Sequence, residues 1–177
     1  MAIEWGNNLQ PIKVYHSSNV DFETPDISKA KEGSNYGKGF YTTTKVDKKQ
    51  GYGDIDYEYD LDASGLGDLT DYDFSKEQLD NLYNLTKGRN NYTQDEINDF
   101  FGKDFKVSNN GKRDSLLRFR MGLLGRMANN MNISVNDLLD KMGVGKFSSI
   151  KIPQNDDTNY YVVFDPNKLK FVKKVKK

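Results

Sequence analysis

The chain has 177 residues, with 26 Lys or Arg against 26 Asp or Glu, so its formal net charge is zero. It is long enough for one domain with a core of its own, and a balanced charge gives no global attraction to nucleic acid or membranes. The absence of cysteine excludes disulfides and zinc–thiolate sites. Because there is no leader-like N-terminus and no run of eighteen apolar residues, we expect a protein of the cytoplasm, or one delivered into a host cytoplasm, without membrane partners.

Two segments carry charge of one sign. Residues 54–80 are acidic with Lys76 as the only basic residue, and residues 168–177 contain six lysines and no acid. The simplest interpretation is two solvated surfaces, and a nucleic-acid patch at the lysines is the alternative.

The first third of the chain predicts three strands. Residues 12–16 alternate and are rich in β-branched and aromatic side chains, which indicates a strand ending at the histidine. The glycines of residues 37–39 introduce a second strand at 40–44. Residues 55–61 alternate strictly, which predicts a half-buried strand, and the Gly- and Asp-rich residues 63–73 predict a connection.

The middle of the chain predicts a helical block over about residues 75–143. Capping residues at Ser75, Thr93 and Ser134 each precede an apolar periodic stretch. The longest helix is expected over about residues 114–130. The block matches no family that we can name, and we expect it to recognise the target.

The last part of the chain predicts strands again, at residues 147–152 and 160–164 and, as an edge strand with outward lysines, at 169–175. Strands, then helices, then strands indicate an α+β fold rather than alternating β and α units. We therefore predict a single domain over residues 1–177 with the helical block inserted between strands.

His16 is the only histidine, so a two-histidine metal site is excluded and no metal is expected. A single histidine at a strand end is commonly structural. Small polar residues follow it, however, and the first third of the chain also contains Tyr41, an aromatic residue just after Gly39. A glycine beside an aromatic residue allows a ligand to approach the backbone closely.

Three segments together resemble a known family. Tyr15–Ser18, Tyr36–Thr43 and Tyr160–Pro166 are similar to the three strand motifs of ADP-ribosyltransferases of the diphtheria-toxin and poly(ADP-ribose) polymerase type. The most similar members are small bacterial and phage-borne versions, which include toxins and effectors. The resemblance covers about 30 residues and implies a split antiparallel β-sandwich that binds NAD in a crevice.

The resemblance also implies roles for individual residues. His16 would bond the adenosine ribose of NAD, the Ser17 backbone would hold the nicotinamide amide, and Tyr41 would stack on the nicotinamide ring. Gly39 would let the dinucleotide approach the backbone, and Tyr52 would be a second stacking residue.

The third motif departs from the family pattern, which has His, Tyr and Glu. Tyr160 stands where active members have the glutamate. A neutral tyrosine in this catalytic position supplies no full charge to the cation that forms when the nicotinamide leaves. Asp156, Asp157, Asp56 and Glu58 are candidate substitutes, and for each the simplest interpretation is a solvated carboxylate.

These observations lead to three functional hypotheses. The first is a mono-ADP-ribosyltransferase that modifies a macromolecular acceptor, a protein rather than a nucleic acid. The second is an NAD-binding interaction or inhibitor module with weak or no turnover. The third is a nucleic-acid-directed toxin of another fold, which would bind nucleic acid in a salt-sensitive way and ignore NAD.

Overall fold

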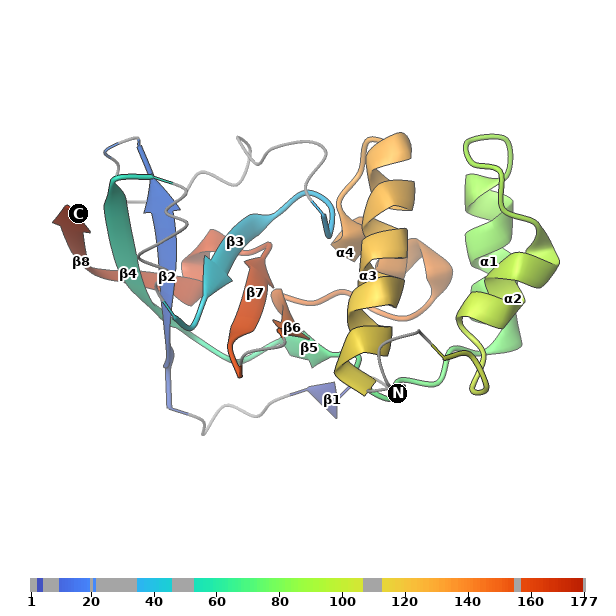
Figure 1. Ribbon diagram of the computed structural model, residues 1–177, viewed down its shortest axis with the longest axis horizontal. Helices are drawn as coiled ribbons and strands as arrows, with labels where there is room; N and C mark the ends of the chain where they lie inside the picture. Colours follow the sequence, from blue (N-terminus) through green and yellow to red (C-terminus); the bar gives the residue numbers. More distant parts are fainter. Residues whose placement is uncertain are drawn as a thin grey trace. The chain divides into compact units, whose positions relative to one another are not determined.

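The computed structural model describes residues 3–4, 10–19, 21, 35–45, 53–106, 113–154 and 157–176. Contacts divide the chain into two compact units. The helical unit comprises Met1–Ile3, Lys31–Lys38 and Leu69–Phe147, and the strand unit comprises Glu4–Ala30, Gly39–Asp68 and Ser148–Lys177. Helices gather in the first unit and strands in the second (Figure 1). The prediction of an α+β fold is confirmed, whereas a single domain stays a prediction.

The strands form one mostly antiparallel sheet. They are β1 (Ile3–Glu4), β2 (Ile12–Ser18), β3 (Phe40–Thr43), β4 (Ile55–Leu61), β5 (Leu66–Asp68), β6 (Ser149–Pro153), β7 (Asn159–Val163) and β8 (Leu169–Lys176). Their order across the sheet is β1-β5-β6-β7-β3-β2-β4-β8. Of the pairs between described strands whose register is defined, β5 with β6 is parallel and the others are antiparallel. As predicted, the lysine-rich β8 is an edge strand, and it pairs with β4.

Two features of the strands differ from the prediction by more than a slight shift of their ends. The first strand does not end at His16 but continues to Ser18, because both serines pair with β4. The connection predicted over residues 63–73 contains β5, a three-residue strand whose partner β6 follows the whole helical block in the chain. Neither feature has a local signal, since each depends on pairing with a distant strand.

The strand β4 has the predicted bounds but not the predicted half-burial. It lies between β2 and β8, and of its seven residues only Asp60 is more than slightly exposed. Its acidic residues Asp56 and Glu58 are only 9% and 7% exposed. The alternation of apolar and acidic residues therefore predicts the strand correctly. It does not predict that the acidic side chains are buried as well.

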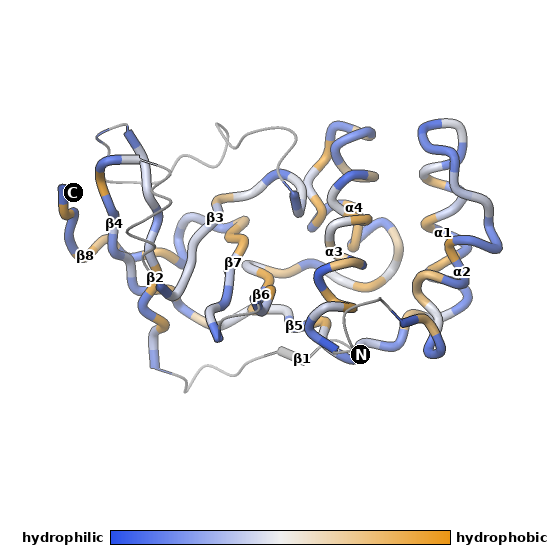
Figure 2. The backbone as a smooth tube through the Cα atoms, viewed as in Figure 1, coloured by the Kyte–Doolittle hydropathy of each residue, from blue (hydrophilic) through white to orange (hydrophobic). Residues whose placement is uncertain are grey.

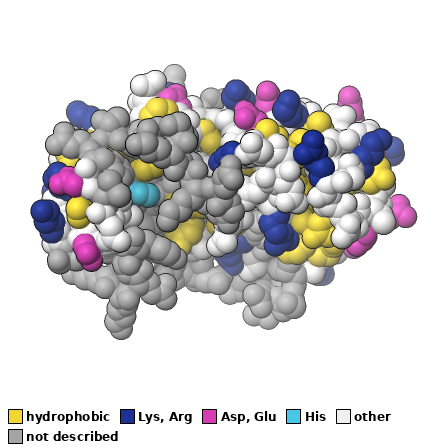
Figure 3. Space-filling model, turned by 90° about the horizontal axis from the view of Figure 1, so that it is seen from above, with side chains coloured by type: hydrophobic (Ala, Val, Ile, Leu, Met, Phe, Trp, Pro, Cys, Tyr) yellow, Lys and Arg dark blue, Asp and Glu magenta, His cyan; other side chains and the backbone are white. Residues whose placement is uncertain are grey.

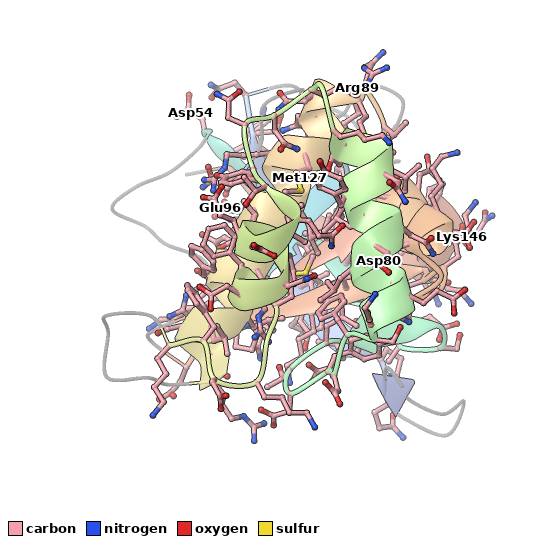
Figure 4. The ribbon with its side chains drawn as sticks, turned by 90° about the vertical axis from the view of Figure 1, so that its right-hand side faces the viewer. Asp54, Asp80, Arg89, Glu96, Met127 and Lys146 are labelled. Carbon is pink, nitrogen blue, oxygen red and sulfur yellow. The ribbon has the colours of Figure 1, made fainter. Side chains whose placement is uncertain are left out.

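The helical unit forms as the capping residues predict. Its helices are α1 (Lys76–Thr86), α2 (Gln94–Phe100), α3 (Arg113–Asn130) and α4 (Val135–Met142). Complete capping boxes at Ser75 and Thr93 begin α1 and α2, and left-handed Gly143 ends α4. Met127 is buried inside this unit, and Arg89 lies at its periphery (Figure 4). Among the described residues, no helix is long and apolar enough to cross a membrane.

The core of the strand unit is rich in aromatic residues. One cluster joins buried side chains of β2 and β4 with those of β3, β5 and β7. Its members are Val14, Phe40, Ile55, Tyr57, Tyr59, Leu61, Leu66, Tyr161 and Val163. The rings of Phe40 and Tyr59 meet edge to face, with centroids 6.0 Å apart. The apolar stretch of β7 shows in orange in Figure 2.

Because these phenols are buried, the free energy of unfolding should fall as the pH rises through the range in which tyrosine ionises. Burial raises the pKa of Tyr59 to about 12, from an ordinary value of 10.0 for a tyrosine phenol. A raised pKa means that the unfolded chain loses its proton first, so stability is lost as the pH rises from 10 to 12. Burial also raises the pKa of Tyr161.

We expect Tyr59→Phe to remove much of this alkaline loss. Each pKa unit corresponds to about 1.4 kcal/mol, so the wild type should lose about 2 kcal/mol more than the variant between about pH 9 and pH 12. Urea unfolding of both proteins at the two pH values measures the difference. If both proteins lost the same free energy of unfolding, ionisation of the Tyr59 phenol would not be the cause of the alkaline loss.

Candidate functional site

The three motif segments lie on adjacent strands. The sheet order contains β7, β3 and β2 as consecutive neighbours. The third motif pairs with the second through Val162 opposite Tyr41 and Tyr160 opposite Thr43. The second motif pairs with the first through Thr43 opposite Tyr15. Segments far apart in the sequence therefore meet at one place in the strand unit.

The join between β2 and β3 is short. Among the described residues it has one register pair, Tyr15 with Thr43, whereas β2 pairs with β4 along all seven residues. Beyond that pair the side chain of His16 connects the two strands. Its Nδ1 donates to the carbonyl oxygen of Tyr41 at 2.7 Å, and its ring stacks on Phe40 with centroids 4.2 Å apart. The histidine therefore holds together two strands that share little backbone pairing.

The His16 ring is at the surface. Figure 3 shows the histidine (cyan) accessible on this face of the molecule, in keeping with its intermediate exposure. Nδ1 is engaged by the Tyr41 carbonyl, so a ribose hydroxyl would have to meet Nε2. This position is compatible with both interpretations of the sequence, structural and ligand-binding.

The side chains of His16 and Tyr41 lie on opposite faces. The His16 ring contacts Phe40, and successive side chains of a strand alternate between faces, so Tyr41 points the other way from Phe40. The resemblance, which has both side chains contact one NAD molecule in a crevice, does not account for this arrangement, because it considers which strands are neighbours and not which faces their side chains occupy. Pairing instead puts Tyr41 on the face of Tyr160, since Val162 and Tyr160 lie opposite Tyr41 and Thr43.

Ser17 and Asp56 lie on this same face. Tyr15 lies opposite Thr43, so its alternate neighbour Ser17 shares the face of Tyr41. Asp56 lies opposite Ser17 on β4. The Ser17 hydroxyl donates to Oδ1 of Asp56 at 2.5 Å. We call Ser17, Tyr41, Asp56 and Tyr160 the polar face of the strand unit.

The four candidate acids have different surroundings. Asp56 and Glu58 are buried, so for these two the interpretation as solvated carboxylates is wrong. Glu58 forms an ion pair with Lys13 at 3.9 Å. Asp157 is exposed, with a φ of 63°, and Asp156 lies outside the described residues. Sequence analysis named Asp56 but missed its link to Ser17, for which only the strand register gives a signal.

Gly39 is required by packing within the sheet. A Cβ at this position would lie 2.3 Å from Cγ1 of Val162 and 3.3 Å from the Phe164 ring. Neighbouring side chains, not open space, therefore surround the glycine that we expected to admit a ligand. Tyr52, the expected second stacking residue, lies outside the described residues.

A pocket with a volume of about 280 Å³ opens in the helical unit. None of the predicted site residues lines it. Its charged residues are engaged with other groups of the same unit: Lys103 with Asp73 and Arg113 with Asp71 at 3.3 and 3.2 Å, and Arg120 with the carbonyls of Phe100 and Gly102. Burial lowers the pKa of the Arg120 guanidinium. These contacts account for the charged groups without a ligand.

Metal ligands do not gather among the described residues, where no group of three or more His, Cys, Asp or Glu side chains could hold an ion.

The protein has an α+β fold with one mostly antiparallel sheet. The three strands that carry the motifs are neighbours in this sheet. The family model described as "Protein of unknown function (DUF3990)" matches residues 12–109, more than half of the chain, and the protein belongs to this family. No curated protein matches the sequence. A structure described as "Crystal structure of an anti-CRISPR protein" covers 94% of this chain and 96% of its own, at 10% identity and a TM-score of 0.37, which is too low a similarity to carry an argument.

Proposed function

We propose that the protein is an NAD-dependent mono-ADP-ribosyltransferase that modifies a macromolecular acceptor, a protein rather than a nucleic acid. One observation carries the proposal. The three segments that resemble ADP-ribosyltransferase motifs are widely separated in the chain, yet they occupy neighbouring strands β2, β3 and β7. A chance resemblance of three short segments would give no reason for this adjacency.

The limited pairing of β2 with β3 also supports an ADP-ribosyltransferase-type split sandwich. Strands β2, β4 and β8 form one group and β5, β6, β7 and β3 another, joined by one described register pair. Apolar side chains of both groups share one core cluster. In this proposal NAD binds at the division, where His16 lies on one face of the sheet and the polar face on the other.

The reaction explains why these groups are useful. The bond between C1′ of the ribose and N1 of nicotinamide breaks, and its electron pair neutralises the ring nitrogen. An acceptor oxygen or nitrogen then bonds to C1′ and releases its proton to solvent. Tyr41 offers a flat surface to the departing ring, and fixed dipoles or charges stabilise the cation that develops at C1′.

The alternative of an NAD-binding module without turnover has one observation in its favour. The position of the family glutamate holds Tyr160, which lies on β7 opposite Thr43. Binding of NAD without release of nicotinamide would favour the alternative.

The decisive experiment incubates the protein with NAD labelled in its adenosine part, with and without cell extract. We expect release of nicotinamide and, with extract, transfer of the label to protein detectable by mass spectrometry. Tyr41→Ala should weaken NAD binding about tenfold through lost stacking, whereas Tyr41→Phe should keep it. Wild-type protein that neither binds NAD nor releases nicotinamide would contradict the proposal, and label found only on nucleic acid would contradict the protein acceptor.

A further inference from the structure

The polar face contains a buried acid next to a proposed ligand-binding residue. Asp56 is 9% exposed and accepts the hydrogen bond of the Ser17 hydroxyl at 2.5 Å. Burial of a carboxylate is costly unless the charge is hydrogen-bonded or has a use. Asp56 comes from β4, on the far side of β2 from the motif strands β3 and β7.

We infer that Asp56 supplies the negative charge that Tyr160 cannot supply in the reaction. This inference rests on the proposed function and assigns the acid of its site. Tyr160 and Asp56 lie on the same face of the sheet, on opposite sides of the β3–β2 join. An acid from β4 therefore replaces one from β7 at the same face.

Asp56 is favoured over Glu58 by three observations. Asp56 lies opposite Ser17, beyond the one described pair that joins β2 to β3, whereas Glu58 lies opposite Tyr15, which forms that pair with Thr43. The Ser17 hydroxyl bonds directly to Asp56. Glu58 already forms an ion pair with Lys13, which offsets its charge.

The carboxylate takes part without forming a covalent bond. As the bond from C1′ to the nicotinamide nitrogen breaks, positive charge grows on C1′ and the ring oxygen of the ribose. A fixed carboxylate near the ribose hydroxyls stabilises that charge more than it stabilises neutral ribose. It keeps its proton state throughout, and the acceptor proton leaves to solvent.

The test compares Asp56→Asn with Glu58→Gln in the full-length protein, each substitution replacing a carboxylate by an amide of the same shape. We measure nicotinamide release at saturating NAD and the affinity for NAD. Asp56→Asn should lower the rate about 100-fold, the size of effect expected for one electrostatic group, with little change in affinity. Glu58→Gln should keep the wild-type rate.

A second variant decides the question if Asp56→Asn does not fold. Ser17→Ala leaves both the carboxylate and the Ser17 backbone in place but removes the hydrogen bond that the Ser17 hydroxyl donates to the acid. Its rate should fall about tenfold with unchanged NAD affinity. A wild-type rate in Asp56→Asn, or in Ser17→Ala when Asp56→Asn does not fold, would overturn the role of Asp56 and leave the proposed function standing. A wild type that releases no nicotinamide would overturn both.

Discussion

Gly125→Ala is expected to lower the free energy of unfolding by about 2 kcal/mol, although alanine is the better helix former. A Cβ on Gly125 of α3 would lie 2.6 Å from the carbonyl carbon of Tyr36 and 2.7 Å from the nitrogen of Gly37. These are backbone atoms, which cannot rotate away, so either the helix or the segment must move. Overpacking of this kind typically costs about 1–3 kcal/mol.

Gly122→Ala is the matched control in the same helix. The nearest atom to its added Cβ would be the carbonyl oxygen of Asn35, at 4.0 Å. With that space open, the helix preference of alanine should raise the free energy of unfolding by about 0.5–1 kcal/mol. Urea unfolding of the two variants beside wild type measures both changes. A lower free energy of unfolding in Gly125→Ala and a higher one in Gly122→Ala would support a close approach specific to Gly125. A higher free energy of unfolding in both variants would refute it.

The contact at Gly125 matters because it packs against Tyr36 and Gly37, at the start of the second motif. Gly37 has a left-handed φ of 85°, and Lys38 bridges to Ser134 and donates to Asn132 at 2.6 Å. The next residue, Gly39, begins the part of the chain that forms β3 in the strand unit. Gly37, near the start of the second motif, is thus part of the helical unit, and its left-handed conformation accounts for the glycine.

Elements with a local cause could be predicted from the sequence. The capping residues Ser75, Thr93 and Ser134 all begin helices, because a cap is a hydrogen bond between near neighbours. The strand over residues 55–61 was predicted to the residue. The three-residue β5 was missed, since its pairing depends on β6 at the other end of the helical block.

The site could be predicted only as a set of residues. Sequence analysis selected Ser17, Tyr41 and Asp56, and resemblance placed two of them in motifs. It could not foresee that Ser17 bonds to Asp56 or that the side chains of His16 and Tyr41 lie on opposite faces of the sheet. Both follow from strand register, and a shift of one residue would reverse every side chain.

His16→Ala and His16→Phe separate the two roles that remain open for the histidine. The alanine variant loses the bond to the Tyr41 carbonyl and the stack on Phe40, for an expected cost of about 2–3 kcal/mol. The phenylalanine variant keeps a ring against Phe40 and loses the hydrogen bond to the Tyr41 carbonyl, so its cost should be about 1–2 kcal/mol. Urea unfolding of both variants beside the wild type measures both values.

The affinity for NAD is expected to behave differently in the same pair. Both variants remove Nε2, the ring nitrogen that does not contact the Tyr41 carbonyl. If His16 contacts NAD directly, the two variants should lose affinity equally, about tenfold for one hydrogen bond, despite their different stabilities. If affinity instead falls more in His16→Ala, in step with stability, the histidine acts only by holding β2 to β3, and direct contact with the ribose is excluded.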